Sequence, residues 1–192
     1  MRVPGKVSPA RILFAACAAF ALAVPVASSA SASAPQNPVA DATGQYCAID
    51  LTAQKKACFT SEQALTDYSS TLASLPLVAV YNWINYNQAG GYSIWYGDHA
   101  CTATTTDVDY ALPTLVGETY DHNNPSGISE NNTYSSVSTY TAQSCDIKLF
   151  DGTNHSGSSS PWIDRCTHLG GSGTGNCPST NWYDRASSFQ LS

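Results

Sequence analysis

Four carboxylates lie close together near the middle of the chain, and they are the first side chains whose type and spacing suggest chemistry. They are Asp107, Asp109, Glu118 and Asp121. A pair of carboxylates can hydrolyse a glycosidic bond, with one residue as the acid and the other as base or nucleophile. Acidic residues in a polar stretch more commonly form a solvated loop, and we interpret these four in that way.

Other common catalytic patterns are missing from the sequence. It contains neither G-x-S-x-G nor H-E-x-x-H, and His99, His122 and His168 stand apart from one another. The glycine-rich stretch LGGSGTGN does not lead from a strand into a helix, so it indicates a loop rather than a phosphate site. We therefore predict that the protein is not an enzyme.

The N-terminus has the order of a secretory signal peptide, which is a basic start, an apolar run and a small-residue cleavage site. We place the signal at residues 1–32, with cleavage after Ala32 and with Ala30 or Ala34 as alternatives. The apolar run is shorter than the roughly 20 residues of a membrane span. Residues 33–45 are small and polar and predict a disordered leader. The mature chain is thus expected to be extracellular and not membrane-bound.

Charge and cysteine content limit the possible functions of the mature chain. Three of the 8 Lys and Arg fall in the signal, so 5 remain against 14 Asp and Glu, a net charge of −9. This balance argues against nucleic-acid binding, which needs a basic surface. Six cysteines remain after the signal, an even number that predicts three disulfides in a secreted monomer. Six cysteines allow 15 pairings. Proximity and position favour Cys47–Cys58, Cys101–Cys145 and Cys166–Cys177. A zinc site is disfavoured because no C-x-x-C pair is present.

Two kinds of element follow the leader. Residues 46–76 predict a small ββα unit, packed as a satellite on the main domain, whose helix starts near Ser61 because Thr60 and Gln63 fit a capping box. The helix is expected to run to Pro76, with its apolar stripe formed by Leu65, Tyr68, Leu72 and Leu75. From residue 77 onward, short β-prone runs alternate with turn residues. This pattern predicts a mainly β sandwich or barrel over residues 77–192.

A six-residue pattern occurs twice in that β region. NNTYSS ends at Ser136 and YDRASS ends at Ser188, an offset of 52 residues. Each copy is preceded by an aromatic strand end, a turn with a ring at Tyr86 or His155, and a glycine. A glycine there permits positive φ, so that the hairpin can fold over onto its sheet.

This arrangement resembles the βγ-crystallin Greek-key motif, which joins an aromatic hairpin to a turn of two Asn/Asp, two spacers, Ser/Thr and Ser. NNTYSS matches the turn at six positions and YDRASS at five, because Tyr183 replaces the first Asn/Asp. The resemblance implies two Greek-key motifs forming a sandwich, the first over residues 77–143 and the second over residues 144–192.

The resemblance also implies weak calcium binding at one or two sites. In calcium-binding members, such a turn supplies a backbone carbonyl and a hydroxyl oxygen. Carried over, Asn132 and Ser135 form the first site, Asp184 and Ser187 form the second, and Asn131 orients the first turn. Neutral ligands imply an affinity on the order of 0.1–1 mM.

Two other functions remain open at this stage. The chain resembles, in size, export and cysteine use, a family of crystallin-like secreted bacterial metalloproteinase inhibitors, which implies an extracellular protease as partner. The loops Cys166–Cys177 and Ala100–Asn124 are its candidate inhibitory segments. Binding of carbohydrate or cell wall is the third function, suggested by Trp83, Trp95, Trp162 and Trp182 if their rings are exposed.

Overall fold

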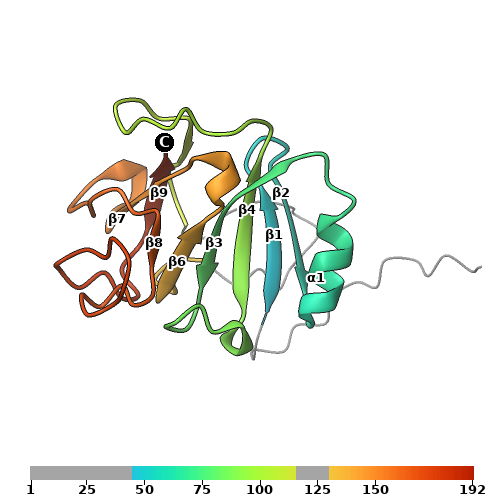
Figure 1. The fold of residues 1–192 in the computed structure, drawn as a ribbon, viewed down its shortest axis with the longest axis horizontal. Helices are drawn as coiled ribbons and strands as arrows, with labels where there is room; N and C mark the ends of the chain where they lie inside the picture. The colour runs from blue at the N-terminus through green and yellow to red at the C-terminus, as the bar shows by residue number, and fades with distance from the viewer. Residues whose placement is uncertain (1–44, 116–129) are drawn as a thin grey trace, which may run out of the picture. The chain divides into compact units, whose positions relative to one another are not determined.

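The computed structural model describes residues 45–115 and 130–192, which form two β-sheets and one α-helix (Figure 1). The prediction of a mainly β protein is confirmed. The strands are β1 (Tyr46–Asp50), β2 (Lys55–Phe59), β3 (Leu75–Tyr81), β4 (Tyr92–Gly97), β5 (Tyr110–Leu112), β6 (Ser136–Thr139), β7 (Ile147–Phe150), β8 (Arg165–Cys166) and β9 (Ser188–Leu191). The α-helix is α1 (Glu62–Ser69), and short 3-10 turns cover Gln88–Gly90, Thr141–Gln143 and Thr153–His155.

Several sequence-based predictions lie outside the described residues. These are the signal peptide at 1–32, the leader up to residue 44, His122, and the carboxylates Glu118 and Asp121. Within the described ranges, no helix is long and apolar enough to cross a membrane.

The first sheet has the strand order β2-β1-β4-β3-β6-β8, and the second has the order β5-β9-β7. Each sheet contains a strand from the other half of the β region. The late strand β8 pairs antiparallel with β6, while the early strand β5 pairs antiparallel with β9. The two halves of the sequence are therefore interleaved and cannot form their sheets separately.

The predicted ββα unit is not a satellite, because its two strands extend the first sheet. Strand β1 pairs in parallel with β4, from Tyr46 opposite Tyr92 to Asp50 opposite Tyr96. The prediction treated the two strands as a self-contained hairpin. The sequence contains no local signal for a parallel pairing between strands about 45 residues apart.

Helix α1 starts close to the predicted position but ends earlier. Its N-cap is Ser61, whose Oγ accepts a hydrogen bond from Ala64 N at 3.3 Å. After Ser69, the hydroxyl groups of Ser70 and Thr71 donate to the carbonyls of residues 67 and 68 at 2.7 Å each. Such local bonds compete with a helix, and the chain enters β3 instead of continuing to Pro76.

Residues of both sheets share one hydrophobic core. Trp95 of β4 and Phe189 of β9 are fully buried, and their rings meet edge to face at 4.9 Å. Tyr134 and Trp182, which precede β6 and β9, are buried in the same core. Burial of each large side chain contributes about 1.5–3 kcal/mol, so this core fixes the turns next to these residues.

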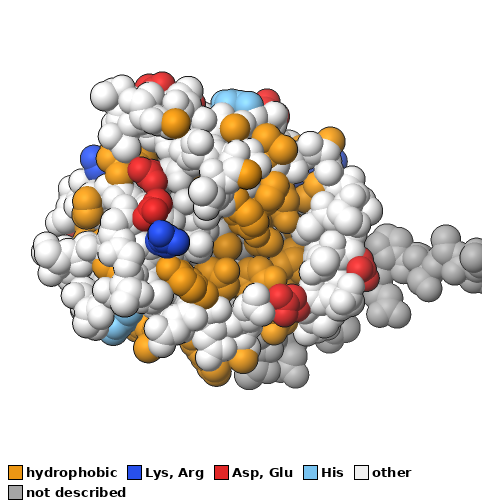
Figure 2. Space-filling model, viewed as in Figure 1, with side chains coloured by type: hydrophobic (Ala, Val, Ile, Leu, Met, Phe, Trp, Pro, Cys, Tyr) orange, Lys and Arg blue, Asp and Glu red, His pale blue; other side chains and the backbone are white. Residues whose placement is uncertain are grey.

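The outer face of the first sheet carries a second apolar cluster. It includes Ala48, Ala79, Ile94 and Tyr96, and Leu65 of α1 packs against it. Figure 2 shows hydrophobic side chains gathered over the first sheet on this face.

The three predicted disulfides are confirmed. They are Cys47–Cys58, Cys101–Cys145 and Cys166–Cys177. Cys47 and Cys58 lie directly opposite each other in the β1–β2 pair. Three disulfides favour an oxidising, extracellular environment.

Candidate functional site

The candidate site depends on a hairpin turn between β3 and β4 that is folded back and held by one serine. Ser136 Oγ donates to the Trp83 carbonyl at 2.7 Å and accepts from Tyr86 N at 3.1 Å. The Tyr86 ring packs against Tyr81 at 5.6 Å, and Tyr86 and Gly91 have φ values of 55° and 82°. The predicted ring-and-glycine turn is therefore present.

The second half of the β region repeats this arrangement. Ser188 Oγ donates to the Gly152 carbonyl at 2.6 Å and accepts from His155 N at 3.1 Å. The His155 ring packs against Phe150 at 5.3 Å, and His155 and Gly157 have φ values of 55° and 77°. The hairpins thus correspond with an offset of 155 − 86 = 69 residues, and the serine turns with an offset of 52.

The two serine turns bind each other in a reciprocal way. Asn132 N donates to the Ala186 carbonyl at 2.9 Å, and Asp184 N donates to the Tyr134 carbonyl at 3.0 Å. Both donors have left-handed φ values, 56° for Asn132 and 50° for Asp184. Asn and Asp tolerate this conformation better than most residues, which explains their presence at the equivalent positions.

Each hairpin is also bonded to a loop of the other half. Asn85 N donates to the Thr167 carbonyl at 2.7 Å, and the equivalent Asn154 N donates to the Pro113 carbonyl at 2.5 Å. Residues 113 and 167 therefore correspond, with an offset of 54. The whole region has an approximate internal twofold relation, defined by paired hydrogen bonds.

Three oxygen atoms from three segments converge at the first serine turn. The buried Ser135 Oγ lies 2.6 Å from the Asn82 carbonyl oxygen and 3.4 Å from Asp184 Oδ1. Burial raises the pKa of the Asp184 carboxyl above its ordinary value, and the hydrogen bond from Ser135 acts in the opposite direction. We call Asn82 O, Ser135 Oγ and Asp184 Oδ1 the oxygen cluster.

The structure groups the predicted site residues differently from the sequence. Asp184 was assigned with Ser187, whereas its carboxylate lies beside Ser135. Asn131 and Asn132 lie in the same turn as Ser135, and the side-chain oxygen of Asn131 is buried. Asn82 was missed, and it carries no sequence signal because it contributes only its backbone carbonyl.

In the second half, the counterpart of Asn82 pairs with a cation of the protein itself. Arg185 follows Asp184, and its Nη2 lies 2.6 Å from Asp151 Oδ2. Asp151 is the counterpart of Asn82, at the offset of 69, and its pKa is lowered chiefly by the Arg185 hydrogen bond. Ser187 is buried here, and its backbone N donates to the Phe150 carbonyl at 2.8 Å.

Among the described residues, no group of three or more His, Cys, Asp or Glu side chains is arranged to hold a metal ion. A cation at either serine turn would therefore depend on carbonyl, hydroxyl and water oxygens, with one carboxylate at most. Hard cations such as calcium accept such oxygen ligands.

The described carboxylates of the acidic stretch bind their own loop. Asp107 and Asp109 both accept hydrogen bonds from Thr102 Oγ1, at 3.1 and 3.2 Å; Thr102 and Asp107 are exposed, and Asp109 is half-buried. This fits the interpretation of a solvated loop, and these bonds hold the segment after Cys101.

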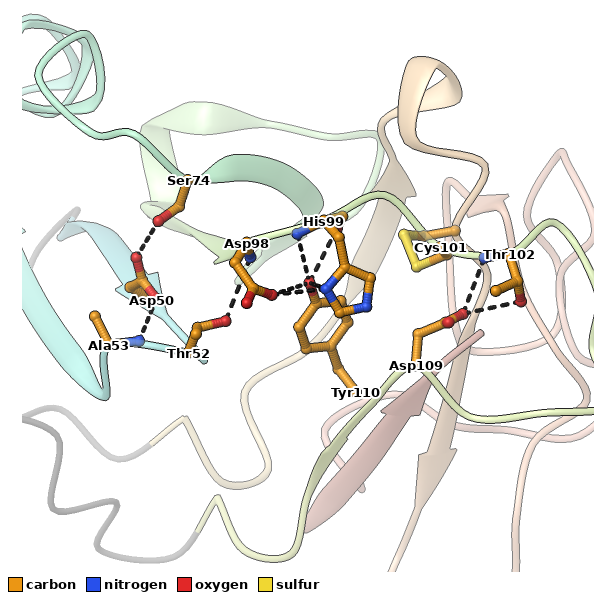
Figure 3. A network of polar contacts seen from close by, with 11 residues as sticks. Asp50, Thr52, Ala53, Ser74, Asp98, His99, Cys101, Thr102, Asp109 and Tyr110 are labelled. Atoms are coloured by element: carbon orange, nitrogen blue, oxygen red, sulfur yellow. Dashed lines mark hydrogen bonds and ion pairs between the residues drawn. A yellow bond between two sulfur atoms is a disulfide. The ribbon is translucent and has the colours of Figure 1, made fainter.

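A neighbouring exposed cluster joins the loop after β4 to β5 (Figure 3). Asp98 Oδ1 lies 2.7 Å from His99 Nδ1 and 2.9 Å from the Tyr110 hydroxyl, and the His99 and Tyr110 rings stack at 4.7 Å. Burial and the neighbouring carboxylate raise the pKa of Tyr110 to about 12, so the hydroxyl stays protonated and donates. We interpret the cluster as a structural contact that holds the loop after β4 against β5.

The four tryptophans occupy different environments. Trp95 and Trp182 are buried at 0 and 1% exposure, which contradicts the expectation that their rings are exposed. Trp162 is half-buried, and the ammonium of Lys148 lies 5.6 Å from its ring centre. Trp83 is 51% exposed, although it belongs to the hairpin turn that Ser136 holds.

Comparison with protein-family models, with curated proteins and with solved structures finds no match to this chain.

Proposed function

We propose that the protein is a secreted, non-enzymatic βγ-crystallin-type Greek-key protein that binds one calcium ion weakly at the oxygen cluster. The observation that carries the proposal is that Ser135 Oγ contacts both the Asn82 carbonyl oxygen and the Asp184 carboxylate, which come from different halves. The ion would strengthen the contact between the halves, because its ligands come from both.

The strand arrangement supports the Greek-key part of the proposal. In each half, two strands joined by the folded hairpin are followed by a strand that crosses to the opposite sheet, and then by a strand that returns. In the first half these are β3, β4, β5 and β6, with β5 in the second sheet. In the second half, β7, β8 and β9 follow the same course, and the bridge between Phe150 and Ser159 takes the place of the second strand.

The electrostatics favour one calcium site over two. Burial raises the pKa of the Asp184 carboxyl above its ordinary value, which disfavours its charged form when no cation is bound. A bound cation would favour its charged form. At the second serine turn, the fixed guanidinium of Arg185 already neutralises Asp151 and would repel a second cation.

A thermal melt in calcium and in EDTA tests the proposal. At about 1 mM calcium and a Kd of about 0.1 mM, one site stabilises the fold by about 1.4 kcal/mol. For a domain of this size, that increment raises Tm by about 3–6 °C. We expect Asp184→Asn and Ser135→Ala to lose most of the rise.

Ser187→Ala is the matched control, because Ser187 is the counterpart of Ser135 at the other turn. It should retain the calcium-induced rise, and calorimetric titration should give one ion per chain. Equal Tm values in calcium and in EDTA would show that the serine turns have only a structural role and bind no calcium. A stoichiometry of two would show that Arg185 does not exclude the ion.

Inhibition of an extracellular metalloproteinase is the second candidate function, favoured by the rigidity of the disulfide-closed loop Cys166–Cys177. Inside it, Thr174 N donates to Thr167 Oγ1 at 2.7 Å. Asn176 Oδ1 accepts from Arg165 N at 3.1 Å. A loop held in this way loses little entropy when it enters a protease cleft.

Titration of a thermolysin-type zinc protease with the mature protein tests this second function. An inhibitor should abolish activity at about one equivalent, and cleavage of the Cys166–Cys177 bridge should weaken it. Unchanged protease activity at a large molar excess would refute inhibition of that protease class.

A further inference from the structure

An open cleft of about 430 Å³ lies beside the folded hairpin of the first half. We call it the Trp83 cleft, and its lining residues are Trp83, Ile84, Asn85, Asn87, His168 and Tyr183. None of these residues is Asp, Glu, Lys or Arg. Trp83, Ile84 and Tyr183 are exposed at 51, 39 and 39%, so large apolar side chains face solvent at a site with polar neighbours.

Trp83 is held in position even though its ring is exposed. A Cβ atom added to Gly90 would lie 2.5 Å from Trp83 Cγ, so the indole lies directly on the glycine backbone. The Trp83 carbonyl is bound by Ser136 Oγ at 2.7 Å. Asn82 Nδ2 donates to the Gly90 carbonyl at 3.1 Å and fixes the backbone beneath the ring. The indole therefore presents a prearranged flat surface.

The other half of the chain supplies the second side of the cleft, which is held by specific contacts. His168 Nδ1 lies 2.8 Å from Ser172 Oγ, and the imidazole meets the Tyr183 ring edge to face at 5.8 Å. A Cβ on Gly170 would lie 2.6 Å from His168 Nε2, so this glycine also makes room for a ring.

The fold itself does not require these aromatic side chains. At the offsets of 69, 52 and 54 residues, the counterparts of Trp83, Tyr183 and His168 are Gly152, Asn131 and Thr114. The second hairpin keeps the same backbone hydrogen bonds without any of the three rings. The aromatic groups are thus an addition to one half, which points to a ligand.

The chemistry of the lining selects a neutral ligand that has both apolar faces and hydroxyl groups. The C–H face of a pyranose ring stacks on the negative π face of an indole. The amide of Asn87 is fixed through its Oδ1, which accepts from Ala89 N at 3.0 Å, and its NH₂ group can donate to a sugar hydroxyl. The cleft volume falls within the range of small-molecule sites.

We propose that the Trp83 cleft binds a neutral β-1,4-linked saccharide, with one sugar ring stacked on the Trp83 indole. β-1,4-Linked chains are flat ribbons that expose their apolar ring faces, which suits an open cleft with one fixed indole. This inference goes beyond calcium binding and does not depend on it, because no member of the oxygen cluster lines the cleft.

Sedimentation of the mature protein with insoluble chitin and cellulose tests the proposal, with the same assay run in EDTA and in calcium. We expect wild-type protein to bind at least one of the two polymers. Trp83→Ala should weaken binding tenfold or more. Gly90→Ala should also weaken it, because the new Cβ displaces the indole without removing it.

Trp162→Ala is the matched control, since it removes a partly exposed indole outside the cleft. It should bind the polymer as wild type does. Retention of Trp83→Ala at the wild-type level would overturn the proposal, and so would failure of wild-type protein to bind either polymer. Saccharide binding that persists in EDTA would separate this function from the calcium site, whatever the calcium melts show.

Discussion

The hydroxyl of Ser136 connects the start of β6 to the folded hairpin between β3 and β4. Removal of this hydroxyl tests the structural argument most directly. Ser136 is fully buried, and its Oγ binds the Trp83 carbonyl and the Tyr86 amide. Ser136→Ala leaves the partly buried Trp83 carbonyl and Tyr86 amide without this partner. At about 1 kcal/mol for each of the two bonds, with an added desolvation cost, we expect a loss of about 2–3 kcal/mol.

Urea unfolding of the oxidised protein, followed by tryptophan fluorescence, measures this loss. In a separate thermal melt, the same loss should lower Tm by about 5–10 °C for a domain of this size. Ser138→Ala is the control. Ser138 lies in the same strand, it is half-buried, and its hydroxyl makes no hydrogen bond within the described part of the chain. It should cost less than about 0.5 kcal/mol.

The twofold relation gives the prediction a second requirement. Ser188 makes the equivalent pair of bonds to Gly152 and His155, so Ser188→Ala should cost the same as Ser136→Ala within about 1 kcal/mol. If Ser136→Ala unfolds at the same urea concentration as Ser138→Ala, the hairpin is held by something other than the serine. If only one of the two serines matters, the two halves are not equivalent in energy.

Three further results are expected. The calcium-induced rise in Tm should vanish as pH falls through the pKa of Asp184, which lies above the ordinary value of about 4. Without calcium, ionised Asp184 lowers the stability of the fold at pH values above its raised pKa, and this cost disappears below about pH 4. Melts of wild type and Asp184→Asn over a pH series test both statements. Glu130→Gln should cost about 3 kcal/mol in urea unfolding, because Lys56 Nζ lies 3.3 Å from Glu130 Oε1 with both side chains buried; a loss below 1 kcal/mol would contradict this. Removal of the Cys101–Cys145 bridge, which spans 44 residues, should lower the free energy of unfolding by about 4 kcal/mol, against about 3 kcal/mol for either bridge that spans 11. Replacing both cysteines of one bridge at a time and ranking the stabilities of the three variants checks this order.

Local patterns predicted the parts of the fold that depend on neighbouring residues. The positions of β3, β4, β6, β7 and β9 agree with the β-prone runs LVAVYNW, GGYSIWYG, YSSVSTY, CDIKLFDG and SSFQLS, because β-prone residues bounded by turn residues identify strands directly. The two-residue strand β8 and the parallel pairing of β1 with β4 were missed. Both depend on partners far away in the sequence, and neither leaves a periodic signal of its own.

The candidate site was predictable only in part, for a similar reason. The recurrence of the Ser-Ser turns identified Ser135 and Asp184 as members of a pair of sites. It placed them in different sites, because the sequence does not show that the turns face each other across reciprocal hydrogen bonds. Backbone ligands such as the Asn82 carbonyl can be assigned only once the hairpin is folded.

The differences between the two halves are more informative about function than their similarities. Serines at 136 and 188 are retained because each closes a hairpin, and a substitution would cost stability in either half. Trp83 opposite Gly152, and Thr133 opposite Arg185, are exchanges that leave the paired hydrogen bonds intact. A scaffold that tolerates either residue does not select between them. We therefore propose that the indole on one hairpin serves a ligand and that the guanidinium in one turn excludes a cation, so each proposal places its bound ligand at only one of the two equivalent positions.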